Sequence, residues 1–139
     1  GFTASCSKMD VGYLRTEGAS FTPDSLNVFH NIDSTSVQAT DSLPFVSIRI
    51  QGVAGTNPVN YELSSVKADS PSASELFMKL YKEGKISVAG GLIVVSQDAS
   101  RQLTNGRYVL SLKVYNEDHE AILKDVFKIV VTDDELPTA

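Results

Sequence analysis

The sequence predicts an all-β protein, an antiparallel sandwich of about seven or eight short strands with one short helix. Three observations lead to this fold class. Apolar and polar residues alternate over several short stretches, most regularly over 107–114 and 127–132, as in strands that bury one face. Glycine, proline and asparagine separate these stretches, which is typical of tight turns. Only the segment after Pro71 has apolar residues at helical spacing.

Size and charge limit the classes of protein to which this chain can belong. Its 139 residues are 42% hydrophobic and 21% charged, which is enough for one domain with its own core. No stretch approaches the roughly 18–20 apolar residues of a membrane-spanning helix. The formal net charge of -5 argues against nucleic acid as a partner, because phosphate binding needs clustered Lys and Arg.

Residues 1–25 are predicted to form a polar tether, in which 11–14 has the composition of a short edge strand. Cys6 is the only cysteine, so the chain cannot form an internal disulfide. The small residues Ala4 and Ser5 precede Cys6 and polar residues follow it, as at the lipid-bearing cysteine of a bacterial lipoprotein. We therefore expect Cys6 to carry a lipid, and the alternative is a free thiol in a frayed terminus.

Three stretches in the first half of the chain alternate as strands do: 26–29, 45–50 and 59–63. In the second stretch, Val46, Ile48 and Ile50 share the face that is expected to be buried. Glycine, asparagine and proline in 52–58 predict a turn between the second and third strands.

The segment after Pro71 predicts a helix of about two to three turns that ends near Gly84. A serine within 72–74 is expected to cap its first turn. Its apolar face consists of Leu76, Phe77, Leu80 and Tyr81. Such a face usually packs, so we expect this helix to cover the open end of the core. A strand is the alternative, because the residues at 76, 78 and 80 also alternate.

The second half of the chain contains two predicted hairpins. Gly90-Gly91 joins strands over 85–88 and 92–95, because paired glycines accept the positive φ angles of a tight turn. The last two strands are expected to pair antiparallel across the polar loop Asn116–Glu120. Their core-facing residues are expected to be Tyr108, Leu110, Leu112, Val114, Phe127, Ile129 and Val131.

Leu103, Gly106 and Tyr108, at the entry to the penultimate strand, resemble the tyrosine corner of immunoglobulin-like sandwiches. In that corner the tyrosine hydroxyl forms a hydrogen bond with the backbone a few residues upstream. The alternating run from Gly106 to Asp133 resembles the end of a cadherin-like domain. The chain as a whole is similar to a surface lipoprotein of Bacteroidetes type that carries such a module.

The resemblance implies a domain organisation and a location. It implies an immunoglobulin-like or cadherin-like sandwich over 26–135 and a tail at 136–139. It also implies an extracytoplasmic protein, held by its N-terminal lipid on the bacterial outer membrane and exposed at the cell surface.

Cadherins raise the question of calcium, which needs six to eight oxygen ligands brought together. The run Asp133-Asp134-Glu135-Leu136-Pro137 lacks the asparagine of a cadherin linker. The acidic residues at Asp98 and in Asn116-Glu117-Asp118 are too scattered to complete a ligand set. We therefore predict no metal site and no cofactor.

No residue pattern typical of catalysis is present. The sequence contains no Gly-x-Ser-x-Gly turn, and its two histidines, His30 and His119, lie in no metal or catalytic motif. Both histidines are expected to be solvated surface residues. We therefore predict that the chain is not an enzyme.

The predicted function is a non-catalytic module for adhesion or protein–protein contact, made through edge strands and the loops at 52–59 and 116–120. The alternative is a glycan-binding protein of a polysaccharide-utilisation system. Sugar rings usually stack on exposed aromatic rings, and the chain has no tryptophan. Tyr115 and Tyr13 are the best candidates for such ligand contact. The partner is thus a surface protein or a polysaccharide.

Overall fold

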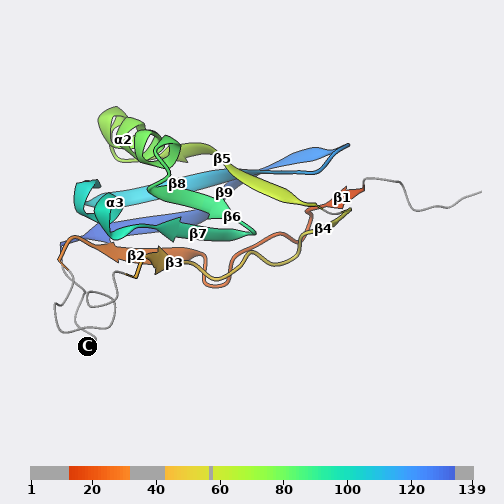
Figure 1. The fold of residues 1–139 in the computed structure, drawn as a ribbon, viewed down its shortest axis with the longest axis horizontal. Helices are drawn as coiled ribbons and strands as arrows, with labels where there is room; N and C mark the ends of the chain where they lie inside the picture. Colours follow the sequence, from red (N-terminus) through yellow and green to blue (C-terminus); the bar gives the residue numbers. More distant parts are fainter. Residues whose placement is uncertain (1–12, 32–42, 57, 134–139) are drawn as a thin grey trace, which may run out of the picture.

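The computed structural model describes residues 13–31, 43–56 and 58–133, and shows an all-β fold with two short helices (Figure 1). The strands are β1 (Leu14–Arg15), β2 (Ser25–Phe29), β3 (Phe45–Val46), β4 (Ala54–Gly55), β5 (Asn60–Lys67), β6 (Ile86–Ala89), β7 (Leu92–Val95), β8 (Gly106–Tyr115) and β9 (Glu120–Thr132). The helices are α2 (Pro71–Lys82) and α3 (Gln97–Gln102). Cys6 and the tail at 136–139 lie outside the described residues.

The strands form a larger sheet of order β2-β9-β8-β5, a smaller sheet of order β3-β7-β6, and the pair β1-β4. The expectation that every strand pairs antiparallel is wrong in one place. The first strand of the larger sheet, β2, lies parallel to the last strand, with Ser25 opposite Lys128 and Phe29 opposite Thr132. The free side of β9 would otherwise be an unpaired edge, and β2 covers it.

Both sheets contribute side chains to a single core. All seven residues predicted to face the core from the last two strands are at most 1% exposed. The smaller sheet adds Phe45, Ile86, Ile93 and Val95 from the other side. The hairpin between β6 and β7 is confirmed, with φ angles of 59° and 81° at the two glycines of its turn.

The strand predicted over 45–50 is observed only as the two residues of β3, and the burial predicted for Val46, Ile48 and Ile50 is correct only for Ile50. Phe45 and Ser47 are buried, whereas Val46 and Ile48 are 44% and 46% exposed. The ring centroids of Phe45 and Phe29 lie 5.9 Å apart. The phenylalanine, which is larger than Val46, therefore takes the core position. Ser47 is tolerated inside because its hydroxyl accepts the N–H of Ile93 at 2.9 Å. The side chains of Val46 in β3 and of Ile48 just after it are therefore left on the solvent side.

The predicted helix is confirmed as α2, although Ser70 caps it rather than a serine within 72–74. The Ser70 hydroxyl accepts the N–H of Ala73 at 3.2 Å, and Pro71 follows at the start of the helix. Phe77 and Leu80 are fully buried. The helix packs on β5 and β6, the strands at which the two sheets approach each other, so it closes that side of the core.

A second helix, α3, is absent from the sequence-based prediction. Ser96 caps it by accepting the N–H of Ala99 at 3.1 Å. Six residues span fewer than two turns, too few for a helical period to be recognised. Asp98 in this helix forms an ion pair with Lys85 at 2.8 Å.

The range predicted for the tether, residues 1–25, is too long, because its last part belongs to the folded body. Phe21 is a buried core residue and packs against Phe127 with ring centroids 4.7 Å apart. The strand β1, which pairs with β4, overlaps the edge strand expected at 11–14 only at residue 14, while residues 11 and 12 lie outside the described part. The folded body therefore begins well before residue 26.

Candidate functional site

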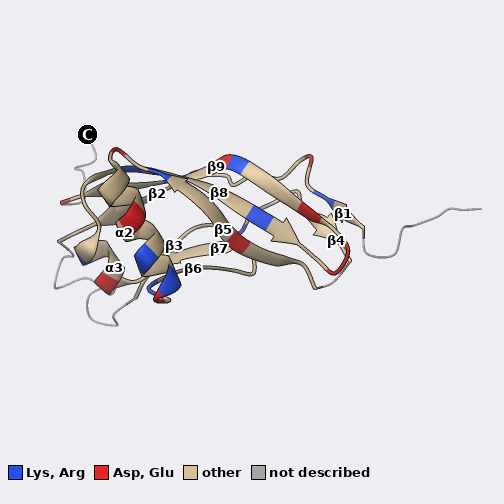
Figure 2. Ribbon diagram, turned by 90° about the horizontal axis from the view of Figure 1, so that it is seen from above, with Lys and Arg blue, Asp and Glu red and all other residues tan. Residues whose placement is uncertain are grey.

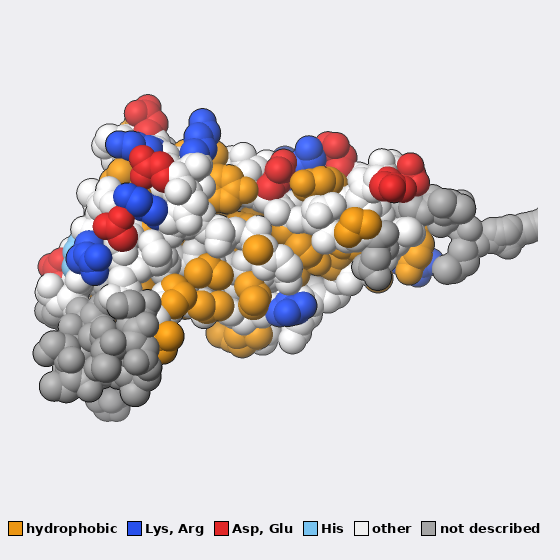
Figure 3. Space-filling view, in the orientation of Figure 1, with side chains coloured by type: hydrophobic (Ala, Val, Ile, Leu, Met, Phe, Trp, Pro, Cys, Tyr) orange, Lys and Arg blue, Asp and Glu red, His pale blue; other side chains and the backbone are white. Residues whose placement is uncertain are grey.

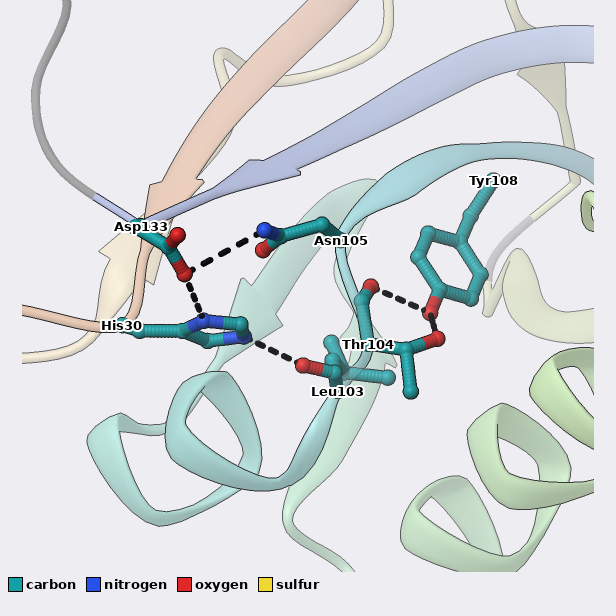
Figure 4. A network of polar contacts seen from close by, with 6 residues as sticks. All are labelled: His30, Leu103, Thr104, Asn105, Tyr108 and Asp133. Atoms are coloured by element: carbon teal, nitrogen blue, oxygen red, sulfur yellow. Dashed lines mark hydrogen bonds and ion pairs between the residues drawn. The ribbon is translucent and has the colours of Figure 1, made fainter.

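Two residues of the predicted tyrosine corner, Leu103 at the end of α3 and Tyr108 in β8, lie near each other (Figure 4). The Tyr108 hydroxyl donates to the carbonyl oxygen of Thr104 at 2.7 Å and lies 2.9 Å from the Thr104 hydroxyl. The ring of Tyr108 is fully buried and stacks on Phe77 at 5.3 Å. Leu103 is buried beside it, and Gly106 has a φ of 141°, where a Cβ would collide with the Asp69 carboxylate. The expected hydrogen bond to the upstream backbone is thus present.

His30, at the end of β2, extends this corner into a network that joins three segments (Figure 4). Its Nδ1 lies 2.9 Å from Oδ1 of Asp133, and its Nε2 is hydrogen-bonded to the Leu103 carbonyl oxygen. The expectation that His30 is a solvated surface residue is wrong, since its side chain is 23% exposed.

Asp133 is the anionic partner in this network. Its Oδ1 also accepts from Nδ2 of Asn105 at 3.2 Å. The hydrogen bond from His30, followed by that from Asn105, holds the pKa of Asp133 below its ordinary value. The network therefore ties the ends of β2 and β9 to the loop that enters β8.

Tyr13 and Tyr115, the predicted ligand contacts, lie in neighbouring segments, but neither ring has a fully exposed face. The Tyr13 carbonyl oxygen accepts from Asn116, the residue after Tyr115, at 2.8 Å. Both side chains are half-buried. The Lys113 ammonium lies 5.2 Å from the Tyr115 ring centroid, and the Arg15 guanidinium lies 5.9 Å from that of Tyr13. Each ring already has a cation over it, which makes a stacking platform for sugars less favourable.

The loop between β8 and β9 is held by its own first residue. Oδ1 of Asn116 accepts the N–H groups of Asp118 and His119 at 3.1 and 2.9 Å. This side chain is therefore not a free oxygen donor for a cation. Within the described ranges, no three His, Cys, Asp or Glu side chains are grouped as they would be around a metal ion.

The surface feature that sequence reasoning missed is the outer side of the smaller sheet. We define the apolar face as Val46 and Ile48 with Leu92 and Val94 of β7, which lie beside them. Figure 3 shows hydrophobic side chains gathered over this part of the molecule. A signal was present in the sequence, because four consecutive apolar residues in 92–95 leave no polar face for solvent.

Charged residues do not collect into one broad surface. Lys and Arg are interspersed with Asp and Glu over the described ribbon (Figure 2). The described segments contain no helix of the length and apolar character needed to cross a bilayer. Comparisons of the chain with protein family models, curated proteins and solved structures gave no match.

Replacing Tyr108 by phenylalanine is expected to lower the free energy of unfolding by about 1 kcal/mol, because the hydrogen bond to Thr104 is lost while the buried ring remains. Urea denaturation of both proteins measures this difference. Tyr115→Phe is the matched control and is expected to change stability by less than about 0.5 kcal/mol. Equal effects of the two substitutions would contradict a structural role for the Tyr108 hydroxyl.

The pairing of Asp133 predicts a pH dependence of stability. Its pKa is lowered in the folded state from an ordinary value of 3.8, so its contribution is present above pH 3.8 and is lost as pH falls through the folded-state pKa. We expect Asp133→Asn to flatten the decline of unfolding free energy in this acidic range, as measured by urea denaturation from about pH 6 to about pH 2.5. Asp118→Asn is the control, and an unchanged decline in Asp133→Asn would refute the prediction.

Proposed function

We propose that this chain is a non-catalytic module, immunoglobulin-like or cadherin-like in architecture, that serves adhesion or protein–protein contact at a bacterial surface. The observation that carries the proposal is the apolar face on the outer side of the smaller sheet. Two of its residues, Val46 and Ile48, are 44% and 46% exposed. Contiguous exposed apolar side chains on a soluble domain typically mark a contact surface.

The position of β3 adds a second reason. This strand is terminal in the order β3-β7-β6, so one side of its backbone has no strand partner among the described residues. The N–H of Ser47 donates to Ile93 at 2.9 Å, and alternation along an antiparallel ladder then turns the backbone groups of Val46 away from β7. An extended segment of another protein could pair with this side of β3, so that its apolar side chains pack beside Val46 and Ile48 and extend the apolar face. We propose such a strand as the partner.

The neighbours of β3 are consistent with a selective contact. Pro44 precedes the strand, Arg49 follows it, and the strand itself contains two residues. Short length, proline and charge are the features by which edge strands avoid indiscriminate pairing. A partner must therefore match a short stretch, which favours recognition through side chains over backbone pairing alone.

The architecture and the anchor belong to the same proposal. Two sheets that share one core, with the Tyr108 hydroxyl bonded to the backbone at Thr104, support an immunoglobulin-like sandwich. The residues around Cys6 support a lipid anchor that holds the module on the outer membrane. Mass spectrometry of the N-terminal peptide from the full-length protein in its natural context tests the anchor, and an unmodified Cys6 would exclude it.

The contact is tested by panning a random peptide library on the folded domain. We expect selected peptides to carry alternating apolar residues, and to lose at least about tenfold in affinity for Ile48→Lys, because lysine removes the apolar contact with the neighbouring side chains of the added strand. Met78→Lys, which adds the same charge to a half-buried position on α2, is the control. Peptides that bind both variants equally would refute the β3 contact. Retention on a polysaccharide that Tyr115→Ala abolishes would instead favour the glycan-binding alternative.

A further inference from the structure

The outer face of the larger sheet contains a polar hollow of about 330 Å³. It is lined by the apolar side chain of Ile122 and by six residues with polar or charged side chains, after which we call it the polar hollow: Ser64, Ser65, Lys67, Ser111, Lys124 and Asp125. It is formed by β5, β8 and β9, and therefore lies apart from the apolar face on the smaller sheet. None of its residues belongs to the corner around Tyr108.

The polar hollow arises because two irregularities in strand pairing meet at one residue. Between Leu110 and Leu112, the single residue Ser111 of β8 stands opposite three residues of β9, 124–126. On its other side, Ser64 of β5 is the extra residue. Bulges of this kind bend strands and redirect side chains, and they are frequent beside binding sites. Three neighbouring strands are thus distorted at the same level of the sheet.

Ser111 forms the floor of the polar hollow and is only 5% exposed. Its Oγ accepts the N–H of Asp125 at 2.9 Å, which fixes the position of the hydroxyl. Asp125 adopts a φ of 50°, a left-handed conformation that is unusual for a residue other than glycine. Within the described part of the chain, the Ser111 hydroxyl hydrogen has no acceptor. A buried donor in this state favours a ligand that brings an acceptor oxygen.

The charges around the polar hollow favour an anion. Lys67 on β5 reaches across β8 to Asp125 on β9, with Nζ and Oδ2 3.3 Å apart. Lys124 forms no ion pair with any described residue. Two ammonium groups against one carboxylate leave a local surplus of positive charge in a chain whose net charge is -5. Hydroxyl donors beside an uncompensated ammonium are suited to an oxyanion.

We propose that the polar hollow binds an oxyanion, the carboxylate or sulfate group of a ligand. The ammonium of Lys124 supplies the charge, and the hydroxyls of Ser65 and Ser111 donate to the anion oxygens. Ser65 stands directly opposite Ser111 in the β5–β8 pairing, so both hydroxyls belong to the same level of the sheet. This proposal does not depend on the contact proposed for β3.

The site is tested by titrating the isotope-labelled protein with sodium sulfate and with sodium galacturonate at constant ionic strength, using sodium chloride as the reference. We expect saturable shifts in the amide resonances of Ser65, Ser111 and Lys124 with the oxyanions and none with chloride. Lys124→Gln is expected to weaken binding about tenfold, because a charge-assisted hydrogen bond is lost. Shifts that never saturate, or that match those with chloride, would overturn the proposal.

Two substitutions separate the site from general effects of charge and stability. Lys82→Gln on α2 removes the same charge far from β9 in the sequence, and its dissociation constant is expected to stay within about twofold of the original. Ser65→Ala removes an exposed hydroxyl without touching the Ser111–Asp125 bond, and is expected to weaken binding several-fold. If Lys82→Gln weakens binding as much as Lys124→Gln, the site is not where we propose it.

The source of the oxyanion is distinguished with polymers. If a gel containing polygalacturonate retards the protein and one containing neutral galactan does not, and if Lys124→Gln abolishes this retardation, the site is supported and assigned to an acidic polysaccharide. Saturable binding of sulfate or galacturonate without retention by the polymer would support the site and assign it to a small free anion. Equal retention by both polymers would contradict recognition through an anionic group.

Discussion

The pairing of β8 with β9 is the constraint on which the rest of the structure depends. These are the two longest described strands, and the residues of both that face inward are almost completely excluded from solvent. The outer side of β9 accepts β2 in parallel, and the outer side of β8 accepts β5. The core, the parallel N-terminal strand and the corner at Tyr108 are all arranged around this one ladder.

The same ladder explains which surface features are open to solvent. The inner faces of the sheets are filled by packed side chains, so the features open to solvent lie on the outer faces. One is the apolar face, left outside because Phe45 and Ser47 take the inward positions of their segment. The other is the polar hollow, which exists because β9 places three residues opposite Ser111. An irregularity that weakens the pairing locally thereby places hydroxyl and ammonium groups around one hollow.

Prediction from the sequence succeeded where a pattern was long and unambiguous. The strict alternation from Tyr108 to Val114 identified both the strand and its buried side, and the apolar stripe around Phe77 identified α2. It failed where segments were short, or where apolar residues occurred in both alternating sets of a strand so that either set could face the core. In 45–50 both alternating sets contain apolar residues, and the choice between them depends on Phe29, which is distant in the sequence. His30 illustrates the same limit, because its partners Leu103 and Asp133 lie 73 and 103 residues away.

The sequence by itself determined the fold class, the main helix, the final hairpin and the hydrogen bond at Tyr108. Each of these depends on residues close together in the chain: the spacing of apolar residues, the glycines at turns and the residues of the tyrosine corner. Only the tertiary structure decided that β2 runs parallel to β9, that Phe21 belongs to the core, and that the bulges around Ser111 coincide on three strands. These features depend on which strands become neighbours and in what register, and a one-residue change of register reverses the side to which a side chain points. Such choices are made by the whole core together, so no single segment of the sequence specifies them.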